Sequence, residues 1–249
     1  MTSPPTFLEH LAVQPLLPYL RDYAIKGLHE LRVQENGGKF IATRKESYAA
    51  QVMERVDALE NCVRSLRLAL NFILDLDKDQ SDATYLYQYH YENFLLRLTG
   101  IVDRAYRLIG TSLCLNPVKL DKISANQFVA KAVVTDYADL YRLLMKLSDA
   151  VALHKTTRNS IAHSAAYTSR ELGLFTAATS MELELGKIDI GDLMGHYFSK
   201  GGVGLAQLIA EMVSCVQALL DALAPIYETA IGGDASGSVC DTRGHKVGS

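Results

Sequence analysis

The stretch KESYAAQVMERVDALENCVRSLRLALNFILDL, residues 45–76, decides the fold of this chain. Its apolar residues recur at alternating spacings of four and three, which places them along one side of an α-helix. This pattern holds for three heptads, at Val52, Val56, Leu59, Val63, Leu66, Leu70 and Ile73. A helix of this length extends roughly 48 Å at 1.5 Å per residue. One face of it must therefore pack along a partner of similar length.

Residues 82–113 are the expected partner. The same spacing returns there, at Tyr91, Leu95, Leu98, Val102, Ala105 and Ile109. Only a short polar turn, residues 75–82, separates the two segments, so they are expected to form an antiparallel helix hairpin. The hairpin predicts an all-α fold, a helical bundle.

Four tyrosines alternate with other residues at the start of the second helix: Tyr85, Tyr87, Tyr89 and Tyr91. Alternation is typical of a strand, but the segment continues directly into the helical stripe, so we interpret it as helix. Packing at the bundle end or at a dimer interface is the favoured role for these rings. Stacking on nucleic-acid bases is the alternative.

Further helical patterns follow the hairpin and precede it. They cover 7–34, broken near Pro15 and Pro18, then 125–147, about 149–166, 190–198 and 201–231. Ser148 is the expected N-cap of the helix at 149–166. Alternating apolar and polar residues allow a short extended segment near 180–190. We expect a single helical domain over 1–231 and a disordered polar tail over 232–249.

The composition is that of a globular protein with a substantial core, with 49% hydrophobic and 21% charged residues. The formal net charge is −3, whereas general nucleic-acid binders carry a basic excess, so any RNA contact must come from a local basic patch. The four cysteines are far apart and imply no disulfide framework. No signal peptide is evident, and polar residues interrupt the apolar stretch 203–223. These features favour a cytoplasmic protein that does not insert into a membrane.

One short stretch combines a strong cation, an amide and an imidazole at a spacing with known chemistry. It reads R-N-S-I-A-H, from Arg158 to His163. At about 100° per residue, Asn159 and His163 lie one helical turn apart on the same face, and the long Arg158 side chain can reach a ligand beside that face. A guanidinium fits a phosphate, and an imidazole takes or gives a proton near neutral pH. This combination suits phosphodiester chemistry.

The stretch resembles the signature of the HEPN superfamily (higher eukaryotes and prokaryotes nucleotide-binding), in which an Arg, usually followed by Asn, stands a few residues before a His. Those domains are all-α bundles. The resemblance implies a metal-independent endoribonuclease without a cofactor, usually a homodimer with both motifs at one cleft. Many relatives are toxins or defence effectors, and some have lost catalysis. By this resemblance Arg158 and His163 are the expected catalytic residues, and Asn159 is expected to orient the substrate or the His ring.

Tyr167 lies one turn after His163. Some members of the superfamily carry a Tyr two residues after the His, to which a partner enzyme adds nucleotides, but here that place is Ala165. Control by this modification is therefore not expected. Tyr167 is instead expected to line the substrate-binding cleft or to pack beside it.

Two other patterns indicate no further chemistry. Lys200–Gly204 resembles the start of a phosphate-binding loop, but Leu205 and Ala206 stand where that loop needs Lys and Ser or Thr. A flexible hinge before the last helix is favoured instead. His154 and His163 are nine residues apart, on opposite sides of a straight helix, so they cannot share a metal ion and no metal site is expected.

The alternative to an enzyme is a non-catalytic helical module that binds a nucleotide, RNA or a protein partner such as an antitoxin. Exposure of Arg158 and His163 in one cleft would favour the enzyme. Burial of either in a salt bridge, or exposure to bulk solvent alone, would favour the module.

Overall fold

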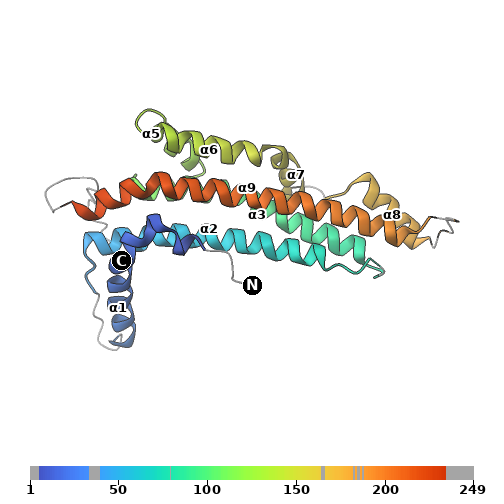
Figure 1. The fold of residues 1–249 in the computed structure, drawn as a ribbon, viewed down its shortest axis with the longest axis horizontal. Coiled ribbons are helices and arrows are strands. Elements are labelled where there is room, and N and C mark those ends of the chain that lie inside the picture. The colour runs from blue at the N-terminus through green and yellow to red at the C-terminus, as the bar shows by residue number, and fades with distance from the viewer. Residues whose placement is uncertain are drawn as a thin grey trace. The chain divides into compact units, whose positions relative to one another are not determined.

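The computed structural model describes residues 6–33, 40–78, 80–163, 166–181, 183, 186 and 188–233. These residues form nine α-helices, two short 3-10 helices and no strand, which confirms the expected all-α fold (Figure 1). The α-helices are α1 (Leu17–Val33), α2 (Arg44–Leu74), α3 (Ala83–Ser112), α4 (Pro117–Leu120), α5 (Ala125–Val133), α6 (Ala138–Ala150), α7 (Ala152–His163), α8 (Arg170–Ser180) and α9 (Ile190–Gly232). The 3-10 helices cover Phe7–Glu9 and Leu11–Leu16. The tail expected beyond 231 lies outside the described residues, except for 232 and 233.

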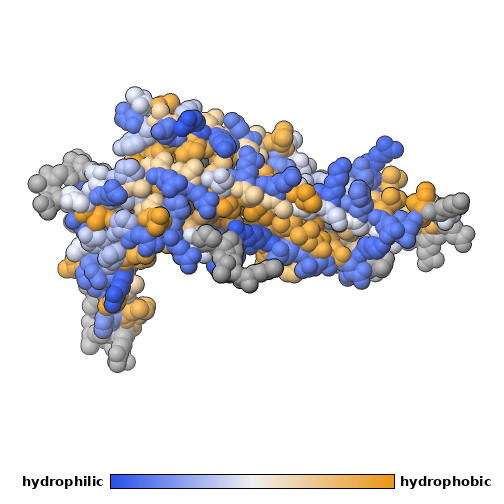
Figure 2. Space-filling model, viewed as in Figure 1, coloured by the Kyte–Doolittle hydropathy of each residue, from blue (hydrophilic) through white to orange (hydrophobic). Residues whose placement is uncertain are grey.

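Contacts within the chain divide it into two compact units. The first comprises Met1–Glu60, Asp103–Leu144 and Val216–Ser249, and the second comprises Asn61–Val102 and Met145–Cys215. Helices α2, α3, α6 and α9 contribute residues to both. By length and composition α9 could cross a membrane, but a core helix passes the same test, and 39% of its most apolar window is buried. The face drawn in Figure 2 mixes hydrophilic with hydrophobic residues.

Helices α2 and α3 run antiparallel, as predicted. Three contacts join them: the Tyr48 hydroxyl donates to the Ser112 carbonyl at 2.9 Å, the Cys62 thiol donates to the Arg97 carbonyl at 3.4 Å, and the rings of Phe72 and His90 stack at 4.7 Å. Residue numbers rise along α2 as they fall along α3, which is the order that an antiparallel hairpin requires. The heptad stripe is the buried side of α2, since its seven members are at most 8% exposed.

A buried polar network joins three helices in the first unit. The Ser112 hydroxyl donates to the Leu108 carbonyl at 2.8 Å and lies 3.2 Å from the Tyr227 hydroxyl. Tyr48 completes the network through the Ser112 carbonyl. Burial raises the pKa of both tyrosines, Tyr48 and Tyr227, so the hydroxyls stay neutral. Each of the three hydroxyl groups in this network therefore has a hydrogen-bond partner, as a buried polar group requires.

The last helix is continuous, and the expected hinge at Lys200–Gly204 is wrong. A Cβ atom on Gly201 would lie 2.2 Å from the Tyr87 hydroxyl oxygen, and one on Gly202 would lie 2.6 Å from a Leu74 methyl carbon. These glycines allow α9 to approach neighbouring side chains closely in the second unit. Packing space, and not backbone freedom, explains their presence.

The helices around the motif are shorter than predicted. The segment 125–147 is interrupted by a turn at 134–137, and the motif helix begins at Ala152. Ser148 lies inside α6, so its predicted role as N-cap is wrong. The chain turns instead at Val151, which is fully buried. Burial of the Val151 side chain explains the boundary between α6 and α7, which no capping pattern in the sequence indicates. The extended segment proposed near 180–190 is absent where the structure describes it.

One cysteine departs from expectation. Cys114, just after α3, is disulfide-bonded, although cysteine spacing did not predict a disulfide. Pairing depends on which thiols the fold brings together, and spacing alone does not give that. Cys62 and Cys215 are buried thiols.

Candidate functional site

The motif residues all lie on α7, in the second unit. None of the twelve residues of this helix is buried, and Leu153 is 88% exposed. His163 is the last residue of the helix. The side that includes His154 and Ile161 is partly covered, whereas Asn159 and His163 are exposed. The motif is therefore presented outward from the chain.

Arg158 and Asn159 are joined directly. Arg158 Nη1 donates to Asn159 Oδ1 at 3.0 Å. This bond uses an acceptor of the Asn159 side chain and leaves its amide nitrogen, with two N–H donors, for a ligand. Arg158 itself is half-buried, and its Nε atom is shielded from solvent without a hydrogen-bond partner among the described residues. Its guanidinium is thus anchored at one edge and held close to the exposed face.

Lys155 extends this face and was missed by the sequence analysis. It is exposed and lies four residues before Asn159, which itself lies four before His163, so the three lie on one face. The spacing was the available signal. No Asp or Glu occurs from residue 150 to residue 170, while Lys155, Arg158 and Arg170 are positive. This is the kind of local basic patch that a chain of net charge −3 needs if it is to bind an anion.

Tyr167 is held against α3. Its backbone N–H donates to Glu92 Oε1, which also accepts a hydrogen bond from Gln88 Nε2 at 3.4 Å. The Tyr167 ring lies 4.4 Å from the Tyr91 ring. Whether Tyr167 binds a substrate stays a prediction; its described contacts are with α3. No sequence pattern indicates Glu92, because it lies 75 residues away from its hydrogen-bond partner Tyr167.

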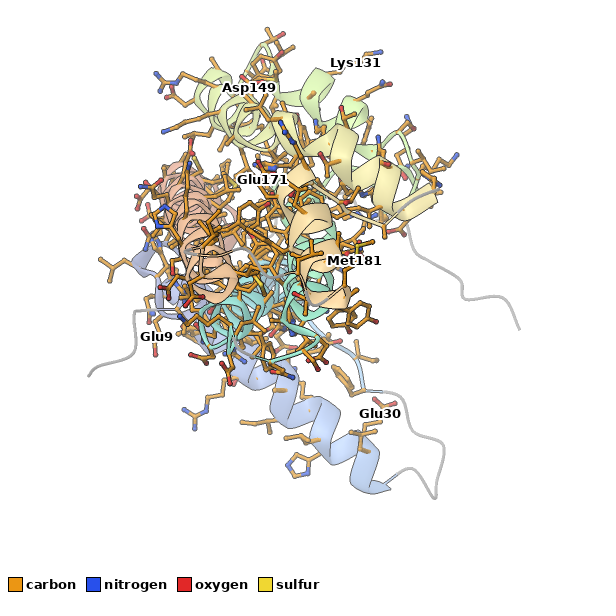
Figure 3. The ribbon with its side chains drawn as sticks, turned by 90° about the vertical axis from the view of Figure 1, so that its right-hand side faces the viewer. Glu9, Glu30, Lys131, Asp149, Glu171 and Met181 are labelled. Atoms are coloured by element: carbon orange, nitrogen blue, oxygen red, sulfur yellow. The ribbon has the colours of Figure 1, made fainter. Side chains whose placement is uncertain are left out.

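Tyr167 belongs to a larger aromatic cluster between α3, α8 and α9. Ring contacts of 4.4–6.3 Å connect Tyr87, Tyr91, Tyr167, Phe175, Tyr197 and Phe198. The Tyr197 hydroxyl lies 2.9 Å from the Ser169 hydroxyl, and Ser169 also accepts the Leu172 N–H as the N-cap of α8. In Figure 3, Glu171 and Met181 mark the two ends of α8. Tyr85 and Tyr89 are exposed and lie outside this cluster.

The buried tyrosine hydroxyls are neutral. Burial is the main cause that raises the pKa of Tyr87, Tyr91 and Tyr167, and the neighbouring tyrosines raise that of Tyr167 further. These hydroxyls therefore act as hydrogen-bonding groups and do not supply a proton near neutral pH. Of the four alternating tyrosines, Tyr87 and Tyr91 pack against other rings, as the favoured expectation had it, whereas Tyr85 and Tyr89 are exposed.

The motif does not line either of two cavities that the structure contains. One, of 760 Å³, is an open depression lined by residues 121–124, 126 and 127. The other, of 270 Å³, is lined by residues that include Lys78, Thr179 and Met194. Among the described residues, no group of three or more His, Cys, Asp or Glu side chains could hold a metal ion. The candidate site is thus an open, donor-rich helix face.

Comparison with known proteins identifies a family. The family model described as Cthe2314-like HEPN matches residues 26–224, which is most of the chain and reaches from α1 into α9. No curated protein and no solved structure matches.

Proposed function

The chain belongs to the Cthe2314-like HEPN family, and on this premise we propose that it is a metal-independent endoribonuclease that acts through the face of α7. The observation that carries the proposal is the exposed row of Lys155, Asn159 and His163 beside the half-buried Arg158. Each of these side chains can donate a hydrogen bond, and two of them carry a fixed positive charge. Such a row suits the phosphates of an RNA backbone.

The proposed reaction needs only the RNA and the protein. The ribose 2′-oxygen attacks the adjacent phosphorus and loses its proton, and the bond from phosphorus to the 5′-oxygen breaks as that oxygen gains a proton. The products carry a 2′,3′-cyclic phosphate and a 5′-hydroxyl. His163 transfers a proton as general base or acid. Arg158 holds the phosphate and stabilises its developing charge, and Asn159 and Tyr167 position the substrate.

Two copies of the chain suit this reaction better than one. One proton must be taken and another given on opposite sides of the phosphorus, and one exposed imidazole cannot do both at once. A two-fold interface along α7 would bring a second His163 to the same substrate. The lack of any buried residue on α7, with Leu153 at 88% exposure, supports a homodimer that covers this helix.

The biological setting is also part of the proposal. Family resemblance supports a toxin or defence effector that acts on RNA in the cytoplasm and is controlled by an antitoxin or another protein partner.

A second function, a non-catalytic module that binds RNA or a nucleotide, is favoured by one observation. His163 is exposed, and neither described cavity includes it. A helix face that is open in a single chain suits binding as well as cleavage.

The deciding experiment is an RNA cleavage assay in EDTA with the full chain. His163→Ala is expected to lower the rate by about 10²–10⁴, the usual contribution of a positioned acid–base group. The matched control is His196→Ala, because His196 is an exposed histidine of α9 in the same unit. Arg158→Lys is expected not to restore the loss seen in Arg158→Ala, since an ammonium lacks the flat pair of donors. The product ends are expected to carry cyclic phosphate.

Two results would contradict the nuclease. They are cleavage abolished by EDTA, and cleavage that survives His163→Ala at the full rate. A wild-type chain that cuts no RNA but binds it through Arg158 would establish the binding module instead.

A further inference from the structure

The motif helix is only partly covered along one side, so attachments at its two ends contribute to its position. A helix is usually held in place by an apolar face that packs on the core, but α7 has no buried residue. At its start, Val151 is fully buried and accepts a hydrogen bond from the His154 N–H at 3.0 Å. Beyond its other end, Tyr167, four residues after His163, is held on α3. The second attachment is the one nearest to the reacting group.

The attachment at Tyr167 combines a hydrogen bond and a ring contact to one helix. Glu92 on α3 accepts the Tyr167 N–H, and the Tyr91 ring lies 4.4 Å from the Tyr167 ring at an angle of 36°. Tyr91 in turn stacks on Tyr87, which is 2% exposed. Tyr167 is therefore tied to half-buried residues of α3 that lie next to the buried Tyr87.

We propose that Glu92 and Tyr91 are positioning residues, which fix the C-terminal end of α7 and so hold His163 in place for proton transfer. This inference rests on the proposed nuclease function and deepens it. Neither residue touches the RNA in this proposal, because both act through Tyr167. Glu92 acts as a hydrogen-bond acceptor, so its oxygen matters and its charge does not.

The expected size of the effect follows from the geometry of catalysis. A displacement of about 1 Å at a catalytic group costs up to about 10²-fold in rate. Glu92→Ala removes the acceptor of the Tyr167 N–H, so kcat is expected to fall by roughly 10- to 100-fold with KM little changed. Glu92→Gln retains a side-chain oxygen that can accept the Tyr167 N–H, and most of the activity is expected to remain.

The test compares the wild-type chain with Glu92→Ala, Glu92→Gln, Tyr91→Ala and the control Glu228→Ala. Glu228 is an exposed carboxylate on α9 and lies in the other unit. Hydrogen exchange of the Tyr167 amide, followed by NMR, reports the anchor directly and needs no activity. Steady-state cleavage of RNA gives kcat and KM, and the His163 ring signals report the position of the imidazole. Tyr91→Ala, which removes the ring, is expected to resemble Glu92→Ala.

The outcomes separate this inference from the proposed function. Faster exchange at Tyr167, shifted His163 signals and a lower kcat in Glu92→Ala and Tyr91→Ala, but not in Glu92→Gln or Glu228→Ala, support it. Unchanged Tyr167 exchange in Glu92→Ala overturns it, as does an unchanged kcat or an equal loss in Glu92→Gln. If the wild type cuts no RNA, the nuclease proposal fails, and the exchange and His163 signals still decide whether Glu92 positions the motif.

Discussion

Replacing Gly201 with alanine should show whether α9 packs as closely as the structure indicates. The added Cβ would lie 2.2 Å from the Tyr87 hydroxyl oxygen and 3.3 Å from the ring carbon that bears it. Tyr87 is 2% exposed and stacks on Phe198 at 4.6 Å, so its ring has no room to move away. Forcing an extra methyl into a packed core costs about 1–3 kcal/mol.

Gly204 is the matched reference, because it lies in the same helix with nothing within 4 Å of its added Cβ. Glycine to alanine in a helix interior gains about 0.8–1 kcal/mol of helix propensity, and both variants receive this gain. Gly204→Ala should therefore stabilise the protein, while Gly201→Ala should lose roughly 0–2 kcal/mol overall. The difference between them, about 1–3 kcal/mol, isolates the clash with Tyr87.

The assay is urea unfolding followed by circular dichroism, with unfolding free energies from linear extrapolation. The double variant with Tyr87→Phe should recover most of the loss, because the atom at 2.2 Å is gone and the nearest remaining one is at 3.3 Å. Equal stability of Gly201→Ala and Gly204→Ala would refute the close approach, and so would a loss that persists after Tyr87→Phe.

Two further predictions concern charge. Lys155→Ala should weaken binding about equally for RNAs of all sequences and should reduce the slope of log affinity against log salt concentration by about one. Fluorescence anisotropy measures this affinity, and Lys200→Ala is the control. Glu46 accepts hydrogen bonds from the Lys26 ammonium and the Thr43 amide, which hold its pKa below the ordinary value of 4.5. Its contribution to stability is therefore complete above pH 4.5 and is lost as the pH falls through its lower folded pKa. The difference in unfolding free energy between wild type and Glu46→Gln should accordingly shrink in acid. A difference that grows in acid would contradict this assignment.

The candidate site was only partly predictable from the sequence. Arg158, Asn159 and His163 could be found because the motif and its helical spacing are local features, and the structure places all three on one short helix. Glu92 could not be found, since its hydrogen bond to Tyr167 joins residues 75 positions apart. The exposure of α7 could not be predicted from the sequence either, because it depends on which residues the other helices leave uncovered.

The sequence by itself determined the fold class, the α2–α3 hairpin and the family. Each follows from apolar periodicity or a short motif, and a helical period of 3.6 residues is expressed within a few turns of chain. Only the tertiary structure decided that α9 continues through Gly201, that Val151 divides α6 from α7, and that Tyr167 is tied to α3. These features depend on space and hydrogen-bond partners supplied by distant segments. A glycine can serve as a hinge or can allow close packing, and the side chains that the tertiary structure places next to it determine which.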